Sequence, residues 1–393
     1  MKSVPLEDIS EELAGLKAQN LLRSLKIVDG PQESHISLGG RRLVNLSSNN
    51  YLGLSNDKRL KNAAISAIKK YGLGAGASRL ICGNMLLHKK LEDRIAAFKK
   101  TEAALLFNSG YCANLAVLSS LCGRDDVVFS DKLNHASIID AIILSRAEFR
   151  RYPHKDIKNL ESLLKNSNGF RRRLIVTDSV FSMDGDLAPL PELTYLAKKY
   201  NCLLYIDEAH ATGILGKTGK GALEYFGIED EAIIQMGTLS KAVGAFGAYV
   251  CGAKILIDYL INKARPFIYT TALPVSVCAG AIAALDIIES DGLLRSGLSE
   301  NIKFFRQALR SLGFKNSLDP TPVIPLLIGD AVKTMEFSRR LFSKGVFVQG
   351  IRPPTVPAGT SRLRITLMAT HKKKDLEFAL DKIAEIGRQL GII

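Results

Sequence analysis

The stretch LLYIDEAHATG, Leu203–Gly213, is a short apolar run that ends in an acidic pair. Apolar runs of this length, bounded by polar or turn residues, are typical of buried strands. Further runs between residues 103 and 252 are AALLFN, DDVVFSD, RLIVTDSV, AIIQMG and AYVCG, with helix-period segments such as 111–121 and 190–200 between them. The alternation predicts an α/β domain in which helices cover both faces of a mostly parallel sheet. Ligands of such sheets bind beyond the carboxyl ends of the strands.

The pattern changes beyond Pro274. A long helical region to about residue 312 precedes TPVIPLLIGD, a helix, VFVQGI, a proline-rich loop, SRLRITLM and a final helix to Leu390. This order predicts a smaller C-terminal α+β domain. We therefore divide the chain into a helical arm over residues 1–45, a large α/β domain over 46–290 and a small domain over 291–393.

Composition limits the classes of protein. The chain has 393 residues, of which 47% are hydrophobic, and a formal net charge of +14. The basic residues are scattered, with short clusters only at 170–173 and 371–374. A nucleic-acid-binding protein is therefore an alternative that rests on net charge and on no other feature of the sequence. Six cysteines without a C-x-x-C pair predict free thiols in the cytoplasm, not disulfides or metal ligands. No apolar run fits an export signal or a membrane span.

Two glycine-rich stretches nearly match nucleotide-binding motifs. YGLGAGASR, residues 71–79, fits a dinucleotide fingerprint in part, but a helix-like segment precedes it where the motif needs a strand. ATGILGKTG, residues 211–219, lacks the first glycine of a phosphate-binding loop, because Ala211 stands there. We expect neither NAD binding nor nucleotide hydrolysis.

A lysine among small residues raises a different possibility. GTLSKAVGAFGAYV, Gly237–Val250, places Lys241 in a glycine-rich turn after a predicted strand, and Asp207 ends the strand before it. Taken singly, Asp207 reads as a helix cap and Lys241 as a surface lysine. Together they match a pyridoxal phosphate enzyme, which needs a lysine for the cofactor aldehyde and an acid for the pyridine nitrogen.

The other groups that such a cofactor needs are also present. Ser109, Gly110 and Tyr111 lie between a strand and a helix, where backbone N–H groups favour an anion. His135 follows a strand and is placed to stack on a ring, although a single histidine is more often structural. Asp178 and Ser182 follow another strand, and Thr238 and Ser240 precede the lysine as candidate phosphate ligands.

The motifs SGYCAN, NHAS, TDSVFSMDGD, DEAHATG and GTLSKAVGAFG occur in the order in which they occur in the α-oxoamine synthases. The chain from about residue 23 to 390 resembles this family of fold-type I pyridoxal phosphate enzymes, which condense an amino acid with an acyl thioester and release carbon dioxide. The resemblance implies a seven-stranded sheet and a homodimer. It makes Lys241 the residue that binds the cofactor and then acts as a base, Asp207 the partner of the ring nitrogen, and His135 a general acid.

The resemblance also implies ligands for the cofactor and the substrates. His210 and Ser182 would hold the phenolic oxygen of the cofactor, and Thr270 and Thr271 would reach the phosphate of the neighbouring subunit. Arg364 is expected to bind the carboxylate of the amino acid, with Arg362 facing away. Arg23, Arg352 and Thr355 are expected to bind the acyl donor.

The segment GIRPPTVPAGTSRLRIT, Gly350–Thr366, bears on the choice of substrate. It looks like the branch that uses L-alanine and a pimeloyl thioester, carried by coenzyme A or by acyl carrier protein. Asn50 stands where that branch commonly has an aspartate, and SRLICG, residues 78–83, leans toward relatives that use glycine and acetyl-CoA. Both reactions are therefore retained as expectations.

Overall fold

A seven-stranded sheet forms the centre of the computed structural model, which describes residues 6–19 and 21–393. Its order is β4-β10-β9-β8-β7-β5-β6, and only β10 runs antiparallel to its neighbours. The strands are β4 (Ala103–Phe107), β5 (Val127–Asp131), β6 (Glu148–Tyr152), β7 (Arg173–Asp178), β8 (Leu203–Asp207), β9 (Ile233–Thr238) and β10 (Ala248–Gly252). The predicted mostly parallel α/β architecture is confirmed.

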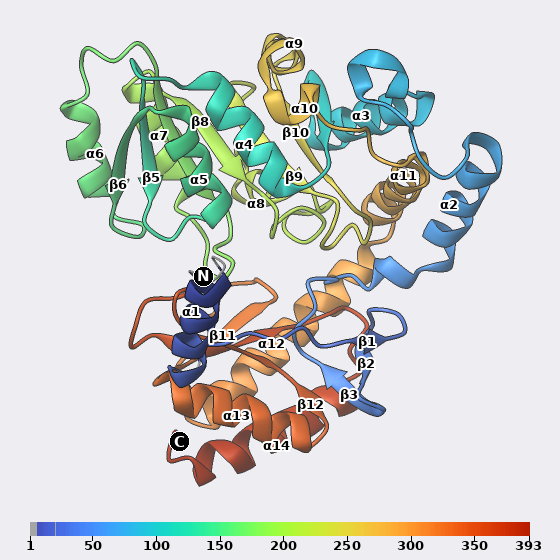
Figure 1. Cartoon of the computed structure of the whole chain (residues 1–393), viewed down its shortest axis with the longest axis vertical. Coiled ribbons are helices and arrows are strands. Elements are labelled where there is room, and N and C mark those ends of the chain that lie inside the picture. Colours follow the sequence, from blue (N-terminus) through green and yellow to red (C-terminus); the bar gives the residue numbers. More distant parts are fainter. Residues whose placement is uncertain (1–5, 20) are drawn as a thin grey trace, which may run out of the picture.

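Helices cover both faces of this sheet (Figure 1). Side chains alternate between the faces along each strand, so Leu174 and Val176 pack in one cluster and Ile175 in the other. One face is covered by α4 (Gly110–Leu121), α5 (Ala136–Ser145), α9 (Lys254–Lys263) and α10 (Arg265–Ile268). The other is covered by α6 (Ile157–Lys165), α7 (Leu190–Lys199) and α8 (Ala222–Phe226).

Two smaller sheets lie beside this layer, in the lower half of Figure 1. One has the order β1-β2-β3-β12, with β1 (Val28–Asp29), β2 (His35–Leu38), β3 (Arg41–Asn45) and β12 (Val346–Phe347). The other has the order β11-β14-β13, with β11 (Val323–Gly329), β14 (Ser361–Thr366) and β13 (Gln349–Ile351). The remaining long helices are α2 (Lys58–Tyr71), α3 (Leu86–Lys99), α11 (Val275–Ser290), α12 (Gly292–Ser311), α13 (Ala331–Ser343) and α14 (Lys373–Gln389).

Three details differ from the sequence-based expectation. Among the described residues of the predicted arm only α1 (Leu6–Ala18) is helical, because β1, β2 and β3 form a sheet with β12 of the C-terminal region. The helical region after Pro274 is two helices, since Asp291 caps α12 through the backbone N–H of Leu293. The charged edge strand β6 was not among the predicted strands. The boundaries near residues 45 and 290 stay predictions.

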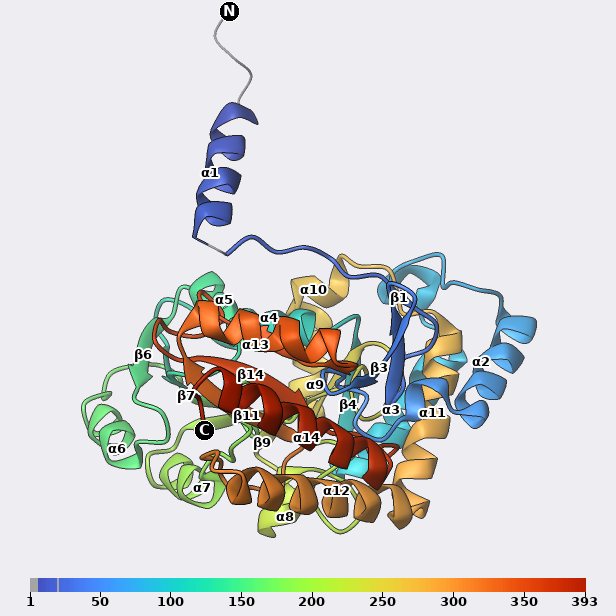
Figure 2. The same ribbon diagram turned by 90° about the horizontal axis from the view of Figure 1, so that it is seen from below.

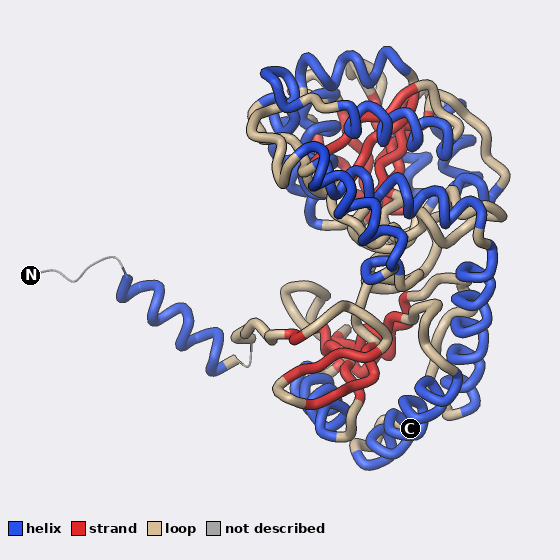
Figure 3. The backbone as a smooth tube through the Cα atoms, turned by 90° about the vertical axis from the view of Figure 1, so that its right-hand side faces the viewer, coloured by secondary structure: helices blue, strands red, loops and turns tan. Residues whose placement is uncertain are grey.

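The helix α1 projects away from the rest of the chain, as the views in Figures 2 and 3 show. None of its residues is buried. Residues 21–27, which precede β1, pass the proline-rich loop that follows β13, where Arg23 donates to the Thr355 hydroxyl. Among the described residues no helix combines the length and apolar character that a bilayer crossing requires.

Candidate active site

The carboxyl ends of β7 and β8 bring two buried carboxylates side by side. Asp178 and Asp207 occupy matching positions in the parallel register, and both are almost fully buried. Burial, and then the charge of Asp207, raise the pKa of Asp178 well above its usual value. The next strand, β9, ends three residues before Lys241. The edge of the sheet thus gathers the acid and the lysine that the sequence predicted there.

Lys241 lies in a tight turn between β9 and β10. Gly244 has a φ of +71°, and a Cβ at this position would lie 2.5 Å from the backbone nitrogen of Ser55, so the turn requires glycine. Burial lowers the pKa of Lys241 to about 8, although the charges of Asp207 and Asp178 partly oppose the shift. A buried amine with this pKa is suited to nucleophilic and base chemistry near neutral pH.

A chain of hydrogen bonds runs from Lys241 to Arg364. The Nζ atom of Lys241 lies 2.9 Å from His210 Nε2, His210 Nδ1 lies 2.7 Å from the Tyr51 hydroxyl, and this hydroxyl donates to Asn49 Oδ1 at 3.0 Å. Tyr51 has one proton, so His210 must donate from Nδ1 and accept from Lys241 at Nε2. Burial and the nearby Lys241 lower the pKa of His210 well below its usual value. His210 is therefore a neutral acceptor for the lysine.

The carboxylate of Asp207 is held by two hydrogen bonds. Its Oδ2 accepts from Asn114 Nδ2 at 3.0 Å, and its Oδ1 accepts from the backbone N–H of Ala209 at 2.9 Å. The Tyr205 hydroxyl donates in turn to the Asn114 side-chain carbonyl. Asn114 lies on α4, so the helix that follows the predicted anion site also orients the acid.

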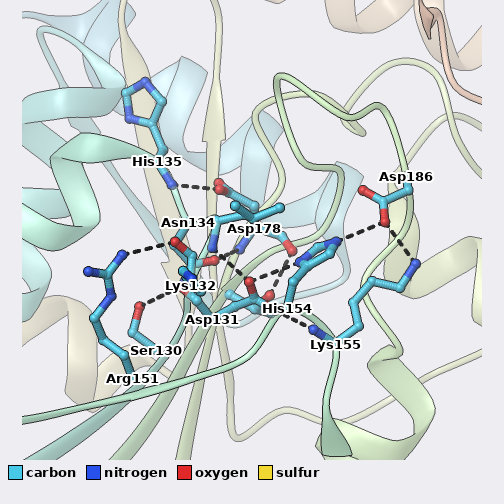
Figure 4. A network of polar contacts seen from close by, with 12 residues as sticks. Ser130, Asp131, Lys132, Asn134, His135, Arg151, His154, Lys155, Asp178 and Asp186 are labelled. Atoms are coloured by element: carbon cyan, nitrogen blue, oxygen red, sulfur yellow. Dashed lines mark hydrogen bonds and ion pairs between the residues drawn. The ribbon is translucent and has the colours of Figure 1, made fainter. Parts of the chain in front are cut away.

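His135 stands at the start of α5, with its backbone next to Asp178 (Figure 4). Its backbone N–H donates to Asp178 Oδ2 at 2.8 Å, and its ring Nδ1 accepts from Ser137. Desolvation lowers the pKa of His135, with Asp207 raising it and Lys241 lowering it. In the neutral form Nε2 then carries the proton, and this N–H is the one available to a bound molecule.

The predicted anion site lies at the first turn of α4. Ser109 caps the helix by accepting from the N–H of Cys112 at 3.2 Å. The N–H groups of Gly110 and Tyr111 have no acceptor within a helix at these positions and carry its positive dipole end. Thr270 and Thr271 lie next to this turn, because both accept from the side-chain amide of Asn108.

Thr238 and Ser240 are engaged elsewhere in this structure. Both hydroxyl groups donate to the backbone carbonyl of Gly247, at 3.0 and 3.2 Å. Thr238 also accepts from the N–H of Ser240 at 3.1 Å. The two residues close the turn that carries Lys241, and their role as phosphate ligands stays a prediction.

Arg362 and Arg364 correct one expectation. Residues two apart on a strand share a face, and both side chains point to the loop after β7. Arg364 donates from Nε to the carbonyl of Ser182 at 2.6 Å, and Arg362 binds the carbonyl of Met183 and the carboxylate of Asp184. Arg362 therefore does not face away. It is paired with Asp184, whereas Arg364 has no carboxylate within salt-bridge distance among the described residues.

The three residues predicted for the acyl donor meet where the N-terminal segment crosses the proline-rich loop. Arg23 donates to the Thr355 hydroxyl at 3.0 Å, and Arg352 donates to the carbonyl of Leu22 at 2.9 Å. Burial, and then the charge of Arg23, lower the pKa of Arg352. Two guanidinium groups close together favour an anion between or beside them.

These residues fit pyridoxal phosphate. The buried carboxylates of Asp207 and Asp178 form no ion pair among the described residues, although burying a charge without a partner is costly. A protonated pyridine nitrogen would supply the missing cation for Asp207. The lysine, the anion site on α4 and the ring of His135 surround the same sheet edge.

Comparisons with known proteins agree with this arrangement. The family described as aminotransferase class I and II matches residues 41–383. An 8-amino-7-oxononanoate synthase of Geobacter sulfurreducens is 54% identical over 387 residues, which is 98% of this chain and 99% of that protein. The synthase of Citrifermentans bemidjiense is 51% identical over 390 residues, 99% of this chain and 100% of that protein. The chain belongs to the 8-amino-7-oxononanoate synthase family.

Solved structures place this family member in the same fold. A serine palmitoyltransferase of Sphingomonas wittichii is 31% identical and superposes with a TM-score of 0.93 over 100% of both chains. An 8-amino-7-oxononanoate synthase of Francisella tularensis is 32% identical, with a TM-score of 0.77 over 88% of this chain and 98% of that one. The recognition of the fold-type I architecture from the sequence is thereby confirmed.

Sequence reasoning missed Tyr51, Asn49 and Asn114 as members of the site. They lie in a loop and a helix whose patterns carry no catalytic signal, and their contacts span 159, 315 and 93 residues of sequence. The one sequence signal for the loop that holds Asn49 and Tyr51 is the polar character of NLSSNNYLGLS, residues 45–55, between apolar segments. A buried polar side chain needs a partner, but the sequence does not say which one.

Proposed function

We propose that the chain catalyses the decarboxylating condensation of L-alanine with a pimeloyl thioester, giving 8-amino-7-oxononanoate, carbon dioxide and a free thiol in biotin biosynthesis. The observation that carries the proposal is the placement of Lys241, bonded to His210, and the buried carboxylate of Asp207 at one sheet edge, in a chain about half identical to synthases of this name. The buried Arg364, free of any carboxylate among the described side chains, supports an amino acid as substrate.

Pyridoxal 5'-phosphate is the cofactor. We assign Lys241 to its aldehyde, Asp207 to its ring nitrogen, His210 and Ser182 to its phenolic oxygen, and Ser109, Gly110, Tyr111, Thr238 and Ser240 to its phosphate. When bound, the cofactor supplies an electron sink for the electron pair left on the α-carbon of the amino acid. Asp207 has the charge and burial to keep the ring nitrogen protonated.

Lys241 first holds the cofactor and, once the amino acid has displaced it, removes the α-proton. Its pKa of about 8 leaves part of the amine unprotonated near neutral pH, and neutral His210 accepts a hydrogen bond from it without competing for the proton. His135 donates from Nε2 to the carbonyl oxygen of the acyl group. Attack of the α-carbon on that carbonyl expels the thiolate, which takes up a proton as free thiol. The resulting β-keto acid loses its carboxylate as carbon dioxide, and protonated Lys241 returns a proton to the α-carbon.

Arg364 orients the amino acid by binding its carboxylate. Its Nε is fixed to the Ser182 carbonyl and its Nη1 to Asn49 Oδ1 at 3.2 Å, which leaves Nη2 to a ligand. Arg23, Arg352 and Thr355 bind the acyl donor, whose carrier is coenzyme A or an acyl carrier protein. The protein acts as a homodimer in the cytoplasm, with Thr270 and Thr271 reaching the neighbouring site. The six cysteines are free in the structure, which suits that compartment.

Spectroscopy and turnover test the proposal. Purified protein loaded with the cofactor should absorb in the visible region, and Lys241→Ala should remove this band. Release of free thiol should be faster with L-alanine plus pimeloyl-CoA than with glycine plus acetyl-CoA. A colourless protein that retards DNA in a gel would exclude the enzyme, and faster turnover of the glycine pair would exclude the proposed substrates.

A further inference from the structure

A second cluster of charged groups lies behind the site, outside the residues that hold substrate or cofactor. It consists of His154 and Lys155, which follow β6, Asp131 at the end of β5, and Asp186 in the loop after β7 (Figure 4). His154 lies 3.0 Å from Asp131 Oδ1 through Nδ1, and 2.9 Å from Asp186 Oδ2 through Nε2. The side chain of Lys155 also binds Asp186 Oδ2, at 2.8 Å.

The geometry defines the protonation state of His154. Carboxylates accept hydrogen bonds and do not donate them, so a ring that contacts one with each nitrogen must carry both protons. Burial opposes this charge, but the hydrogen bonds with Asp131 and Asp186 outweigh it and raise the pKa of His154 to about 9. Besides these carboxylates, the charged or titratable groups that face the cluster among the described residues include Lys155, the buried phenol of Tyr152 and the carboxyl of Asp178, which interacts with Asp131.

Asp131 and Asp186 each lie in a segment that carries a site residue. Asp131 accepts from the backbone N–H groups of Leu133 and Lys155, both at 2.8 Å, and so shapes the loop that leads to His135. In the same loop, the side-chain carbonyl of Asn134 accepts from the backbone N–H of Asp178 at 2.9 Å. The loop from β5 is therefore tied both to the cluster and to the carboxylate edge.

Asp186 orders the loop after β7. Its backbone carbonyl accepts from the N–H of Phe181 at 3.1 Å, which closes residues 181–186 into a turn. The ring of Phe181 packs edge-on against His154, with centroids 4.4 Å apart. The inner side of this turn presents the Ser182 carbonyl to Arg364. His154 thus contacts the turn at both ends without touching the site itself.

We propose that His154 is a positioning residue of the reaction: its doubly hydrogen-bonded ring fixes the loop that carries His135 relative to the turn that holds Arg364. The inference rests on the proposed function, because it concerns the binding of the amino acid. In His154→Gln the carboxylates of Asp131 and Asp186 lose the cation between them, and their repulsion displaces the turn.

Steady-state kinetics of the cofactor-loaded protein test this role. His154→Gln should raise the KM for L-alanine by about tenfold, the effect of one weakened charge-assisted contact, with a smaller change in the KM for pimeloyl-CoA. The matched control is His35→Gln, because the His35 side chain is 24% exposed, against 25% for His154. His35 lies on β2 of another sheet and faces Asp375 on α14. The control should keep both KM values.

A second variant separates positioning from a loss of folded protein. His154→Gln combined with Asp186→Asn replaces the ion pair by two neutral amides and removes the repulsion, so it should recover most of the KM for L-alanine. A fall in kcat with unchanged KM values in the single variant, or a double variant no better than the single one, would overturn the inference. Parent protein that does not condense L-alanine overturns the proposed function instead.

Proton NMR of the parent protein tests the charged state without relying on turnover. The sequence has six histidines, and the imidazole signal that His154→Gln removes identifies His154. This signal should titrate near pH 9 in the folded parent. A midpoint at or below pH 7 would show that the ring does not bridge the two carboxylates as a cation.

Discussion

At the scale of single residues, the chemistry depends on a carboxylate and an amine buried at the same sheet edge. Asp207→Asn keeps the shape of the side chain but removes the charge that keeps a pyridine nitrogen protonated. It also removes the main interaction that raises the pKa of Lys241 against burial. We expect a loss of activity of about 100-fold or more, the range of acid–base effects. Circular dichroism should show an intact fold, and activity near that of the parent would refute the role of Asp207.

Tyr51 is one of the three residues of the site that sequence reasoning did not find. Tyr51→Phe leaves the Nδ1–H of buried His210 without its acceptor and breaks the chain toward Asn49. An unsatisfied buried donor costs about 1–3 kcal/mol, so urea unfolding should show a loss of that size together with a lower kcat. Tyr195→Phe is the control, since Tyr195 is 62% exposed. Equal stability of the two variants would contradict the inferred direction of the chain.

The sequence predicted Asp207, Lys241 and His210 because each lies within a few residues of a strand end, and strand ends can be recognised from local apolar runs. Tyr51, Asn49 and Asn114 could not be predicted in the same way. Their roles arise from contacts across the fold, and the hydrogen-bond partners of a buried polar group are set by tertiary structure.

At the scale of elements, the loop from β7 to α7 is the connection that most constrains the site. Gly185 has a φ of +65°, and a Cβ there would lie 2.0 Å from the carbonyl oxygen of Val323. Gly185→Ala should therefore cost more than about 1 kcal/mol of stability and raise the KM for L-alanine, because the turn also carries the Ser182 carbonyl that holds Arg364.

Gly169→Ala is the matched control for this clash. Gly169 also has a positive φ, +102°, but no atom lies within 4 Å of its added Cβ. This variant carries the backbone strain alone, so it should be destabilised without a change in KM. If both variants behave alike in kinetics and urea unfolding, contact with Val323 does not position the loop.

The strands that sequence patterning missed lack a strong local apolar signal. The strand β6, EFRRY, is a sheet edge with charged, partly exposed side chains, and this composition hides the apolar signal of a strand. The strands β1, β2 and β3 are short, and β3 gains its partner β12 from a segment 300 residues away. The local pattern of apolar residues indicates which side chains of one segment are buried, but it does not indicate which distant strand that segment pairs with.

At the scale of the whole molecule, one hydrophobic core joins the large sheet domain to the C-terminal region. The same cluster contains Tyr51 and Leu54 from the N-terminal loop, Leu285 from α11, Phe305 from α12 and Leu363 from β14. The loops of the site therefore rest on a shared core, and hydrogen bonds such as that of Arg364 to Asn49 join elements that pack on it.

Two histidines make the stability of the folded protein depend on pH in opposite directions. His371 accepts from the N–H of Met368 at Nδ1 and donates from Nε2 to the carbonyl of Asn45, so only the neutral ring fits. Burial lowers its pKa from the ordinary 6.5 to about 4. The unfolded chain then binds a proton more readily than the folded one, and stability should fall by about 3 kcal/mol as pH falls from 6.5 to 4.

His154 acts in the opposite direction, because its pKa in the folded protein is raised to about 9. Its contribution is complete below pH 6.5 and is lost as pH rises through 9. Urea unfolding of the cofactor-free protein should therefore show greatest stability between about pH 6 and 7. His371→Gln should flatten the acidic side and His154→Gln the alkaline side. A parent stability that is constant from pH 4.5 to 9 would contradict both assignments, since the two shifts act in separate pH ranges and do not cancel.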